Sequence, residues 1–131
     1  MNRDKLEAIG TQIVDAAFQV HKELGPGLLE SAYERCLVFE LIERGFRVES
    51  QKKLPIKYKG NLLEGGYRLD LLVENEIIIE LKTVDKILPV HEAQLISYLK
   101  LADKRLGYLI NFKVNLIKDG IFRRVNNIQK S

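Results

Sequence analysis

YRLDLLVENEIIIELKTV, residues 67–84, is the stretch that decides the fold. Two runs rich in leucine and β-branched residues, 67–73 and 77–84, flank the polar segment Glu74-Asn75-Glu76. Such runs are typical of strands that are buried on both faces, and the polar segment is typical of a tight turn. We therefore predict a β-hairpin at the centre of a sheet, with residues equally distant from Asn75 lying opposite each other.

Charged side chains interrupt this apolar hairpin. In the predicted register Asp70 faces Glu80, with Cβ atoms about 5 Å apart, while Glu80 and Lys82 share one face of their strand. Two like charges this close destabilise a fold unless a cation neutralises them. Lys82 would do so in part, and Mg²⁺ or Mn²⁺ would do so better. From the hairpin alone, a charged cluster that only stabilises the fold and a functional site are both open interpretations.

Two helices are predicted on the N-terminal side of the hairpin. Apolar residues from Leu6 to Leu24 recur at spacings of three and four, which is the pattern of an amphipathic helix. The segment Gly25-Pro26-Gly27 ends this helix, and a second helix runs from about residue 28 to residue 44. Short strands are expected at 46–49 and 54–58, followed by a turn at 59–61, a return through Leu62-Leu63 and a break at Gly65-Gly66.

A helix and further strands are predicted on the C-terminal side. Pro89 precedes a helix from residue 91 to about residue 102, which is followed by a strand over 105–112. A strand–helix–strand order implies a parallel crossover from 77–84 to this strand. Residues 115–125 are expected to form a hairpin that turns at Asp119-Gly120. The fold class is therefore α/β, with a central mixed β-sheet flanked by helices.

Composition narrows the class of protein. The chain has 131 residues, of which 46% are hydrophobic and 30% are charged, so we expect one domain over residues 1–131. Its one cysteine, Cys36, excludes an internal disulfide and favours a cytoplasmic location. No apolar run is long enough to span a membrane, and the N-terminus lacks the apolar core of a signal peptide. We expect no membrane association.

The basic residues are unevenly distributed. The net charge is +3, but residues 100–131 hold eight basic and two acidic side chains, a net +6, which leaves −3 for residues 1–99. A second basic cluster comprises Lys52, Lys53, Lys57 and Lys59. Either group, including Arg123-Arg124, is compatible with contact to a nucleic-acid backbone, although a solvated surface is the simpler interpretation of charge alone.

Three short patterns together resemble a known family. Asp70 followed by Glu80-Leu81-Lys82 is similar to the signature of the PD-(D/E)xK nuclease superfamily, except that Leu69 stands where that signature often has proline. The segment GLLESAY at 27–33 resembles the GxxExxY pattern of a bacterial and archaeal family within that superfamily. QLISY at 94–98 resembles the QxxxY pattern of RecB-like members. The resemblance extends over about residues 5–125.

The resemblance implies a restriction-endonuclease-like core and a role for each matched residue. Asp70 and Glu80 would bind Mg²⁺ or Mn²⁺ together with the Leu81 carbonyl, and Glu30 would join them directly or through a water molecule. Lys82 would position the attacking water and offset charge on the phosphate. A lysine has an ordinary pKa of about 10.4, so we favour this role over that of a general base. Gln94 and Tyr98, one helical turn apart, would orient the lysine or bind phosphate.

Three further residues have both a functional and a purely structural interpretation, and a fourth, Glu34, has a structural one only. His21 is either an extra metal ligand or a helix-end histidine that interacts with the helix dipole. His91 either contacts phosphate or caps its helix, and the cap is the simpler interpretation. Tyr33 either faces the site or is a core residue whose hydroxyl is satisfied. Glu34, one turn after Glu30, is expected to face solvent.

The leading hypothesis is a metal-dependent nuclease that hydrolyses phosphodiester bonds, with DNA as the preferred substrate. The alternative is a catalytically silent module that retains the fold and binds nucleic acid or another protein. We recognise no zinc finger, helix-turn-helix or appended arm that would select a target. A nuclease core of this size usually needs a partner or a second copy to hold a duplex, so a homodimer is a further hypothesis.

Overall fold

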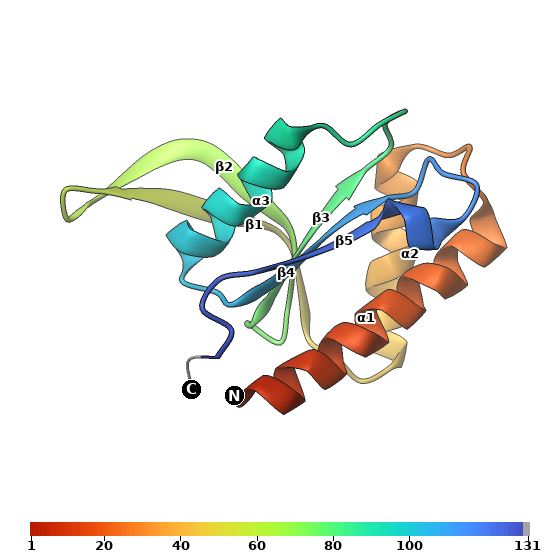
Figure 1. Ribbon diagram of the computed structural model, residues 1–131, viewed down its shortest axis with the longest axis horizontal. Coiled ribbons are helices and arrows are strands. Elements are labelled where there is room, and N and C mark those ends of the chain that lie inside the picture. The colour runs from red at the N-terminus through yellow and green to blue at the C-terminus, as the bar shows by residue number, and fades with distance from the viewer. Residues whose placement is uncertain (130–131) are drawn as a thin grey trace.

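The computed structural model describes residues 1–129, and its centre is a five-stranded mixed sheet with helices on both faces (Figure 1). The strands are arranged in chain order across the sheet, and only β3 and β4 are parallel. The expected α/β class with a mixed central sheet is therefore confirmed. The strand bounds are β1 Val48–Tyr58, β2 Asn61–Val73, β3 Ile77–Lys82, β4 Leu106–Asn111 and β5 Ile121–Val125.

The central hairpin has the predicted register. Leu71 pairs with Ile79 and Val73 pairs with Ile77, so residues equally distant from Asn75 lie opposite each other. Helix α3, Pro89–Ala102, connects β3 to the parallel strand β4, which confirms the expected parallel crossover. All of β3 except Lys82 is buried, because helices cover both faces of the sheet at this strand.

Helices α1, Arg3–Leu24, and α2, Glu30–Glu43, cover one face of the sheet, while α3 covers the other (Figure 1). The side chain of Asn2 caps α1 by accepting a hydrogen bond from the Lys5 amide at 2.8 Å. Gly10 lies where α1 crosses β4, and a Cβ atom there would collide with the hydroxyl of Tyr108. The two faces hold separate apolar cores, so β3 contributes side chains to both.

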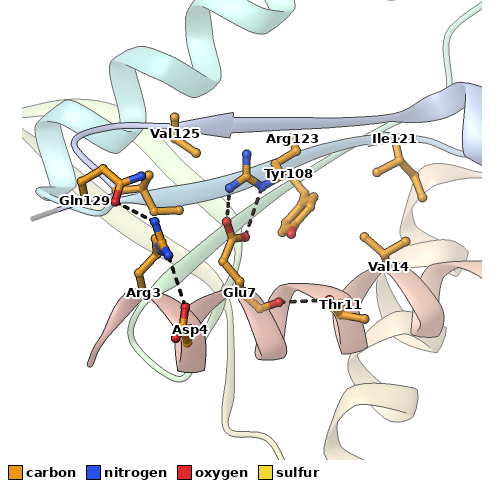
Figure 2. A pocket seen from close by; sticks show the side chains of 11 residues that line it. Arg3, Asp4, Glu7, Thr11, Val14, Tyr108, Ile121, Arg123, Val125 and Gln129 are labelled. Atoms are coloured by element: carbon orange, nitrogen blue, oxygen red, sulfur yellow. Dashed lines mark hydrogen bonds and ion pairs between the residues drawn. The ribbon is translucent and has the colours of Figure 1, made fainter. Parts of the chain in front are cut away.

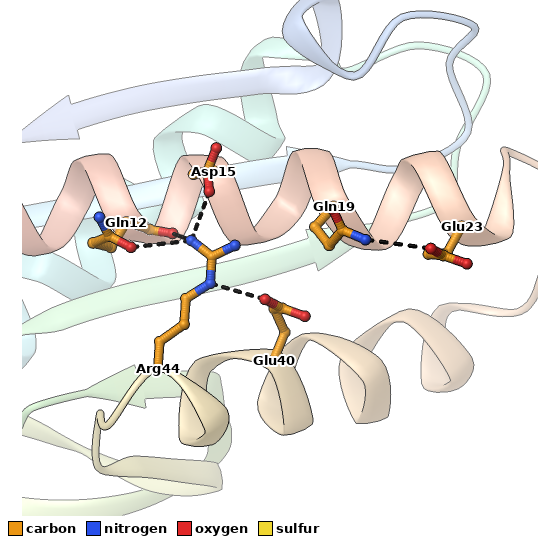
Figure 3. Close-up of polar contacts among 6 residues, drawn as sticks. All are labelled: Gln12, Asp15, Gln19, Glu23, Glu40 and Arg44. Carbon is orange, nitrogen blue, oxygen red and sulfur yellow. Dashed lines mark hydrogen bonds and ion pairs between the residues drawn. The ribbon is translucent and has the colours of Figure 1, made fainter.

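One arginine connects the two helices on the first face. Arg44, directly after α2, donates hydrogen bonds to Glu40 Oε2 at 2.9 Å and to Asp15 Oδ2 of α1 at 2.8 Å (Figure 3). The same guanidinium also reaches the side chain of Gln12 at 3.0 Å. The end of α2 is thereby held against the middle of α1.

The first hairpin is longer and more continuous than predicted. Strand β1 runs without interruption through the segment where two short strands were expected, and β2 continues through Gly65-Gly66. Gly66 has a positive φ of 76°, and the register between the strands changes between Leu54 and Ile56. The two glycines therefore form a bulge rather than a break, because the opposite strand continues to pair on both sides of it.

Beyond this bulge the hairpin projects from the body of the molecule (Figure 1). We call residues 55–68 the hairpin arm, and all but Ile56 of these residues are exposed. The expectation that the chain has no appended arm is therefore wrong. The arm went unrecognised because the glycines indicated the end of a strand.

The segment after β4 also differs from its prediction. Residues Ile117–Gly120 form a short 3₁₀ helix, η1, and β5 then returns along β4 instead of pairing with residues 115–118. Ile117 is 4% exposed and belongs to the core beneath α1. Burial of this side chain favours the 3₁₀ turn over a free hairpin. Within residues 1–129, no helix has the length and apolar character needed to cross a membrane.

Candidate active site

We call Asp70 of β2 and Glu80 of β3 the acidic pair. Each carboxylate accepts a hydrogen bond from a backbone amide of the other residue's strand. The backbone N–H of Asp70 donates to Glu80 Oε2 at 2.9 Å, and the N–H of Leu81 donates to Asp70 Oδ2 at 2.8 Å. These bonds continue the contact between the strands past Leu71–Ile79, the last backbone pair. Each carboxylate is therefore fixed by an amide of the opposite strand, and the two are held side by side.

Strand β2 changes the face that it presents to the core at Asp70. Leu69 packs in the core beneath α3, while Leu71 packs in the core beneath α1 and α2. Two residues of the same parity would lie on one face of a regular strand, so the alternation is broken between them. Opposite this point Gln51 has a φ of 54°, and the paired register of β1 and β2 skips Gln51 and Asp70. At this irregularity Asp70 is not paired with β1, and its amide donates to Glu80 instead.

The acidic pair is electrostatically unfavourable by itself. Glu80 is only 4% exposed, and burial together with the charge of Asp70 raises the pKa of Glu80 to about 8. The Asp70 amide and Lys82 act in the opposite direction but do not compensate fully. A buried carboxyl beside a second carboxylate is a costly arrangement for a purely structural cluster. The centre is therefore suited to attract a cation.

The backbone carbonyl of Leu81 lies on the β2 side of β3. The Lys82 carbonyl accepts a hydrogen bond from the Phe112 amide at 3.0 Å, so Lys82 bonds toward β4. Because successive residues of a strand bond to opposite neighbours, both the N–H and the C=O of Leu81 are directed toward β2. Its carbonyl is thus on the same side as the Asp70 carboxylate that its amide contacts.

Glu30, the first residue of α2, and Lys82 of β3 lie within electrostatic reach of the acidic pair. Partial burial and the charge of Asp70 raise the pKa of Glu30, while Lys82 lowers it. Lys82 also lowers the pKa of Glu80, so its ammonium group lies within electrostatic reach of both glutamates. Within residues 1–129, however, no three His, Cys, Asp or Glu side chains are grouped closely enough to hold a metal ion. Glu30 therefore lies near the acidic pair without completing a three-residue cluster.

Tyr33 positions the start of α2 instead of facing the acidic pair. Its side chain is fully buried, and its ring stacks on Phe112 with the centroids 4.5 Å apart. Its hydroxyl donates to the Gly25 carbonyl and accepts from the Leu28 amide at 3.0 Å. These contacts fix the loop that leads into Glu30, the first residue of α2.

Helix α3 brings Tyr98 close to the acidic pair from the other face of the sheet. Tyr98 is 6% exposed, and burial followed by the charge of Glu80 raises the pKa of its hydroxyl. Gln94 is half-buried one turn earlier on the same helix. In the part of the chain that the structure describes, the Gln94 amide makes no hydrogen bond to the acidic pair.

The two histidines have structural contacts. His21 is buried, its Nε2 lies 2.8 Å from the Val114 carbonyl oxygen, and its ring stacks against Phe112. His91 Nδ1 accepts the Leu88 amide at 3.0 Å, which caps the start of α3. The His91 contact is the helix cap that the sequence suggested, whereas His21 contacts Val114 and Phe112.

Glu34 and Gln51 belong to the surroundings of the site, although the sequence pattern assigned neither to it. Glu34 was expected to face solvent, but its carboxylate accepts hydrogen bonds from Ser50 at 3.0 Å and from Gln51 Nε2 at 2.9 Å. The Gln51 amide also lies 3.5 Å from Asp70 Oδ1. The spacing of Glu30 and Glu34, one turn apart on a helix, was the available signal. The partner strand was not visible in the local sequence.

Arg123 and Arg124 do not form a joint basic patch. They are neighbours on β5, so their side chains leave opposite faces of the sheet. Arg123 pairs with Glu7 in a groove between α1 and the β4–β5 edge, as Figure 2 shows. Arg124 pairs with Glu92 of α3. Both arginines are thus engaged by carboxylates of the scaffold.

Comparison with known proteins identifies one family. A family model described as the PD-(D/E)XK nuclease superfamily matches residues 7–125, which is nearly the whole chain and includes every element described above except the first turn of α1. No curated protein and no solved structure matched the chain.

Proposed function

Because the chain belongs to the PD-(D/E)XK nuclease superfamily, we propose that it is a metal-dependent nuclease that hydrolyses phosphodiester bonds of DNA. The observation that carries this proposal is the buried acidic pair, in which the pKa of Glu80 is raised to about 8 with Lys82 close by. Burying two neighbouring carboxylates is unfavourable for the fold, and a bound cation would offset this electrostatic penalty.

The donor set fits a hard divalent cation. Asp70 and Glu80 supply carboxylate oxygens, and the Leu81 carbonyl is on the same side of β3 as the Asp70 carboxylate. Oxygen donors of this kind suit Mg²⁺ or Mn²⁺. The ion would lower the pKa of water and neutralise charge on the scissile phosphate. Glu30 lies within electrostatic reach of Asp70 and would act through a water molecule.

The remaining residues position the substrate. Lys82, the one cation among these groups, would hold the attacking water and stabilise the negative charge that develops on the phosphate. Tyr98 would donate a hydrogen bond to a phosphate oxygen, because burial and the nearby carboxylates raise the pKa of its hydroxyl and keep it protonated. We assign Gln94 a similar orienting role on the same helix. Tyr33 would act indirectly, by fixing the loop before Glu30.

The chain also carries Gly27, Glu30 and Tyr33 at the spacing of the GxxExxY pattern. We propose that it belongs to that group, and the contacts of Tyr33 support a physical reason for the pattern. The Tyr33 hydroxyl bonds to Gly25 and Leu28, on either side of Gly27, and so holds the loop from which Glu30 starts α2.

The test is cleavage of a substrate panel by purified protein. Linear, circular, single-stranded and branched DNA, together with RNA, are incubated with Mg²⁺ or Mn²⁺ and compared with the same reactions in EDTA. We expect cleavage that requires the ion and is lost in Lys82→Ala. Lys86→Ala, an exposed lysine on the loop after β3, is the matched control and should cut as fast as the wild type.

Circular dichroism of both variants verifies the fold. If Lys82→Ala cuts at the wild-type rate, the assignment is wrong. If no substrate is cut under any condition, the catalytically silent module becomes the better explanation.

A further inference from the structure

One face of the hairpin arm is apolar and aromatic. Leu54 of β1 and Leu69 of β2 pack in the core beneath α3, which marks the face that each strand turns toward α3. Side chains alternate along a strand, so every second residue outward from these two lies on the same face. Leu63 pairs with Ile56 and shares its face. We call the resulting set the stacking face: Ile56, Tyr58, Leu63 and Tyr67.

Two contacts support this assignment independently of the alternation. The ring of Tyr67 meets the ring of Tyr98 edge-on, with centroids 5.9 Å apart and an interplanar angle of 64°. A Cβ atom on Gly65 would collide with Ile56 and lie 3.0 Å from Tyr67 Cδ2, so these two side chains close over the glycine from the same side. The glycine bulge thus allows the stacking face to continue across it.

The stacking face begins beside the acidic pair and is open to solvent. Tyr67 is three residues from Asp70, and its partner Tyr98 lies within electrostatic reach of Glu80. Tyr67 is 44% exposed, Leu63 49% and Tyr58 59%. Four residues separate Leu54 from Tyr58, so the face extends about 13 Å along β1 beyond the core. Apolar surface of this extent on a projecting hairpin indicates that a partner covers it.

The charge of the arm indicates what kind of partner fits. Residues 55–68 contain three basic side chains and one acidic side chain. Lys59 lies over the ring of Tyr58, 5.5 Å from its centroid. A second copy of this arm would bring the same excess of positive charge and would be repelled. A polyanion with flat apolar groups could pair with the basic side chains and stack on the aromatic rings.

We propose that the hairpin arm binds single-stranded nucleic acid, with unpaired bases stacked on Tyr67 and Tyr58 and a phosphate close to Lys59. The bases of a duplex are paired and stacked inside the helix, so aromatic rings on a strand gain little from it, whereas every unpaired base offers a flat face. The arm would lead a strand toward the acidic pair. The inference rests on the proposed nuclease function and names the substrate that this function acts on.

Binding without cleavage tests the arm separately from the catalytic centre. In EDTA, fluorescence anisotropy measures the affinity of the full chain for a labelled 20-nucleotide DNA strand, the same strand in RNA, and the blunt DNA duplex. We expect at least one single strand to bind about tenfold more tightly than the duplex. The comparison of the two single strands shows whether the arm prefers DNA, as the proposed function expects, or RNA.

Variants then locate the contact. Tyr58→Ala and Tyr67→Ala should each weaken single-strand binding about tenfold and change duplex binding less than twofold. Tyr67→Phe should bind as the wild type does, because stacking needs the ring and not the hydroxyl. Phe39→Ala removes an aromatic side chain that is 66% exposed on α2 and serves as the matched control without loss of affinity. Tyr58 lies far out on the arm, so its variant remains informative even if Tyr67→Ala unfolds.

Three binding or assembly results would overturn the proposal, in addition to the cleavage result given below: equal affinity for duplex and single strand, an unchanged affinity in Tyr58→Ala, or a dimer by size-exclusion chromatography that dissociates in Tyr58→Ala. The last result would assign the stacking face to a second copy of the chain. Absence of cleavage in Mg²⁺ with intact single-strand binding would remove only the proposed function. Cleavage by Tyr58→Ala and Tyr67→Ala at the wild-type rate on single strands would remove only the proposal about the arm.

Discussion

The charged residues of the scaffold and those of the acidic pair follow opposite rules. Arg44 pairs with Asp15 and Glu40, Arg123 pairs with Glu7, and Arg124 pairs with Glu92, so each of these three cations is matched by a carboxylate. In the acidic pair two carboxylates are fixed beside each other, and Lys82 offsets their charge only in part.

The difference shows which charges serve the fold and which are free to serve another purpose. Opposite charges at a partly exposed interface stabilise by up to about 1 kcal/mol, and neither partner needs a third group. Like charges in a buried site destabilise the protein unless a bound cation neutralises them. The raised pKa of Glu80 records that unfavourable state. The following predictions test this contrast by changing one side of it at a time.

The largest expected effect is on catalysis. Asp70→Asn preserves an acceptor for the Leu81 amide but removes the charge, so we expect cleavage to fall by about a thousandfold, equivalent to about 4 kcal/mol of activation free energy. Asp15→Asn makes the same chemical change in the scaffold and should leave the rate within about twofold of the wild type. Initial rates at saturating Mg²⁺ measure both. A similar loss of cleavage rate in both variants would mean that the charge of Asp70 matters no more for catalysis than the charge of Asp15.

The next effect is on stability in the absence of metal. The pKa of Glu80 is about 8 in the folded protein, against an ordinary value of 4.5, so the folded state holds this proton more tightly than the unfolded state. This contribution to stability is complete below about pH 4.5 and is lost as the pH rises toward 8. Glu80→Gln keeps the acceptor for the Asp70 amide without the charge, and should therefore be more stable than the wild type by about 2 kcal/mol at pH 8.

Urea unfolding of both proteins in EDTA at pH 5 and pH 8 measures this difference. The difference in unfolding free energy between Glu80→Gln and the wild type should be smaller at pH 5, where the wild-type Glu80 is protonated. Glu40→Gln is the scaffold control and should lose stability, because Glu40 has Arg44 as its partner. A Glu80→Gln protein that is less stable than the wild type at pH 8 would show that its charge is compensated.

A smaller effect is expected when metal is added. Mg²⁺ at ten times its dissociation constant should stabilise the wild type by about 1.4 kcal/mol, because it binds only the folded site. Differential scanning calorimetry in EDTA and in Mg²⁺ measures the shift in Tm. Glu80→Gln should show little shift, whereas Arg44→Met should shift as the wild type does. A shift of the wild-type size in Glu80→Gln would place the ion elsewhere.

The smallest effect concerns the scaffold itself. Arg44→Met keeps the aliphatic stem and removes the charge, so we expect a loss of about 1 kcal/mol, because Asp15 is largely exposed. The loss should shrink between 0.1 and 1 M NaCl as salt screens the pair. Urea unfolding at both salt concentrations measures it. A salt-independent loss would indicate that packing, not charge, is what Arg44 provides.

The sequence by itself determined the elements whose signals are local. The two apolar runs around Asn75 and the polar turn between them specified the register of the central hairpin, because side chains alternate with a period of two. That register predicted Asp70 opposite Glu80, and in the structure the two residues meet just past the last backbone pair, through hydrogen bonds between their carboxylates and the amides of Asp70 and Leu81. The glycine-containing segment before Glu30 and the glycine after α2 marked the ends of helices for equally local reasons.

The tertiary structure decided everything that depends on a partner far along the chain. Gly65-Gly66 is a bulge and not a break because β1 pairs on both sides of it. Glu34 accepts a hydrogen bond from Gln51 because α2 packs beside β1. Arg123 pairs with a carboxylate of α1, and Arg124 pairs with a carboxylate of α3. Local periodicity states which face a residue occupies, but only the packed fold states what lies opposite that face.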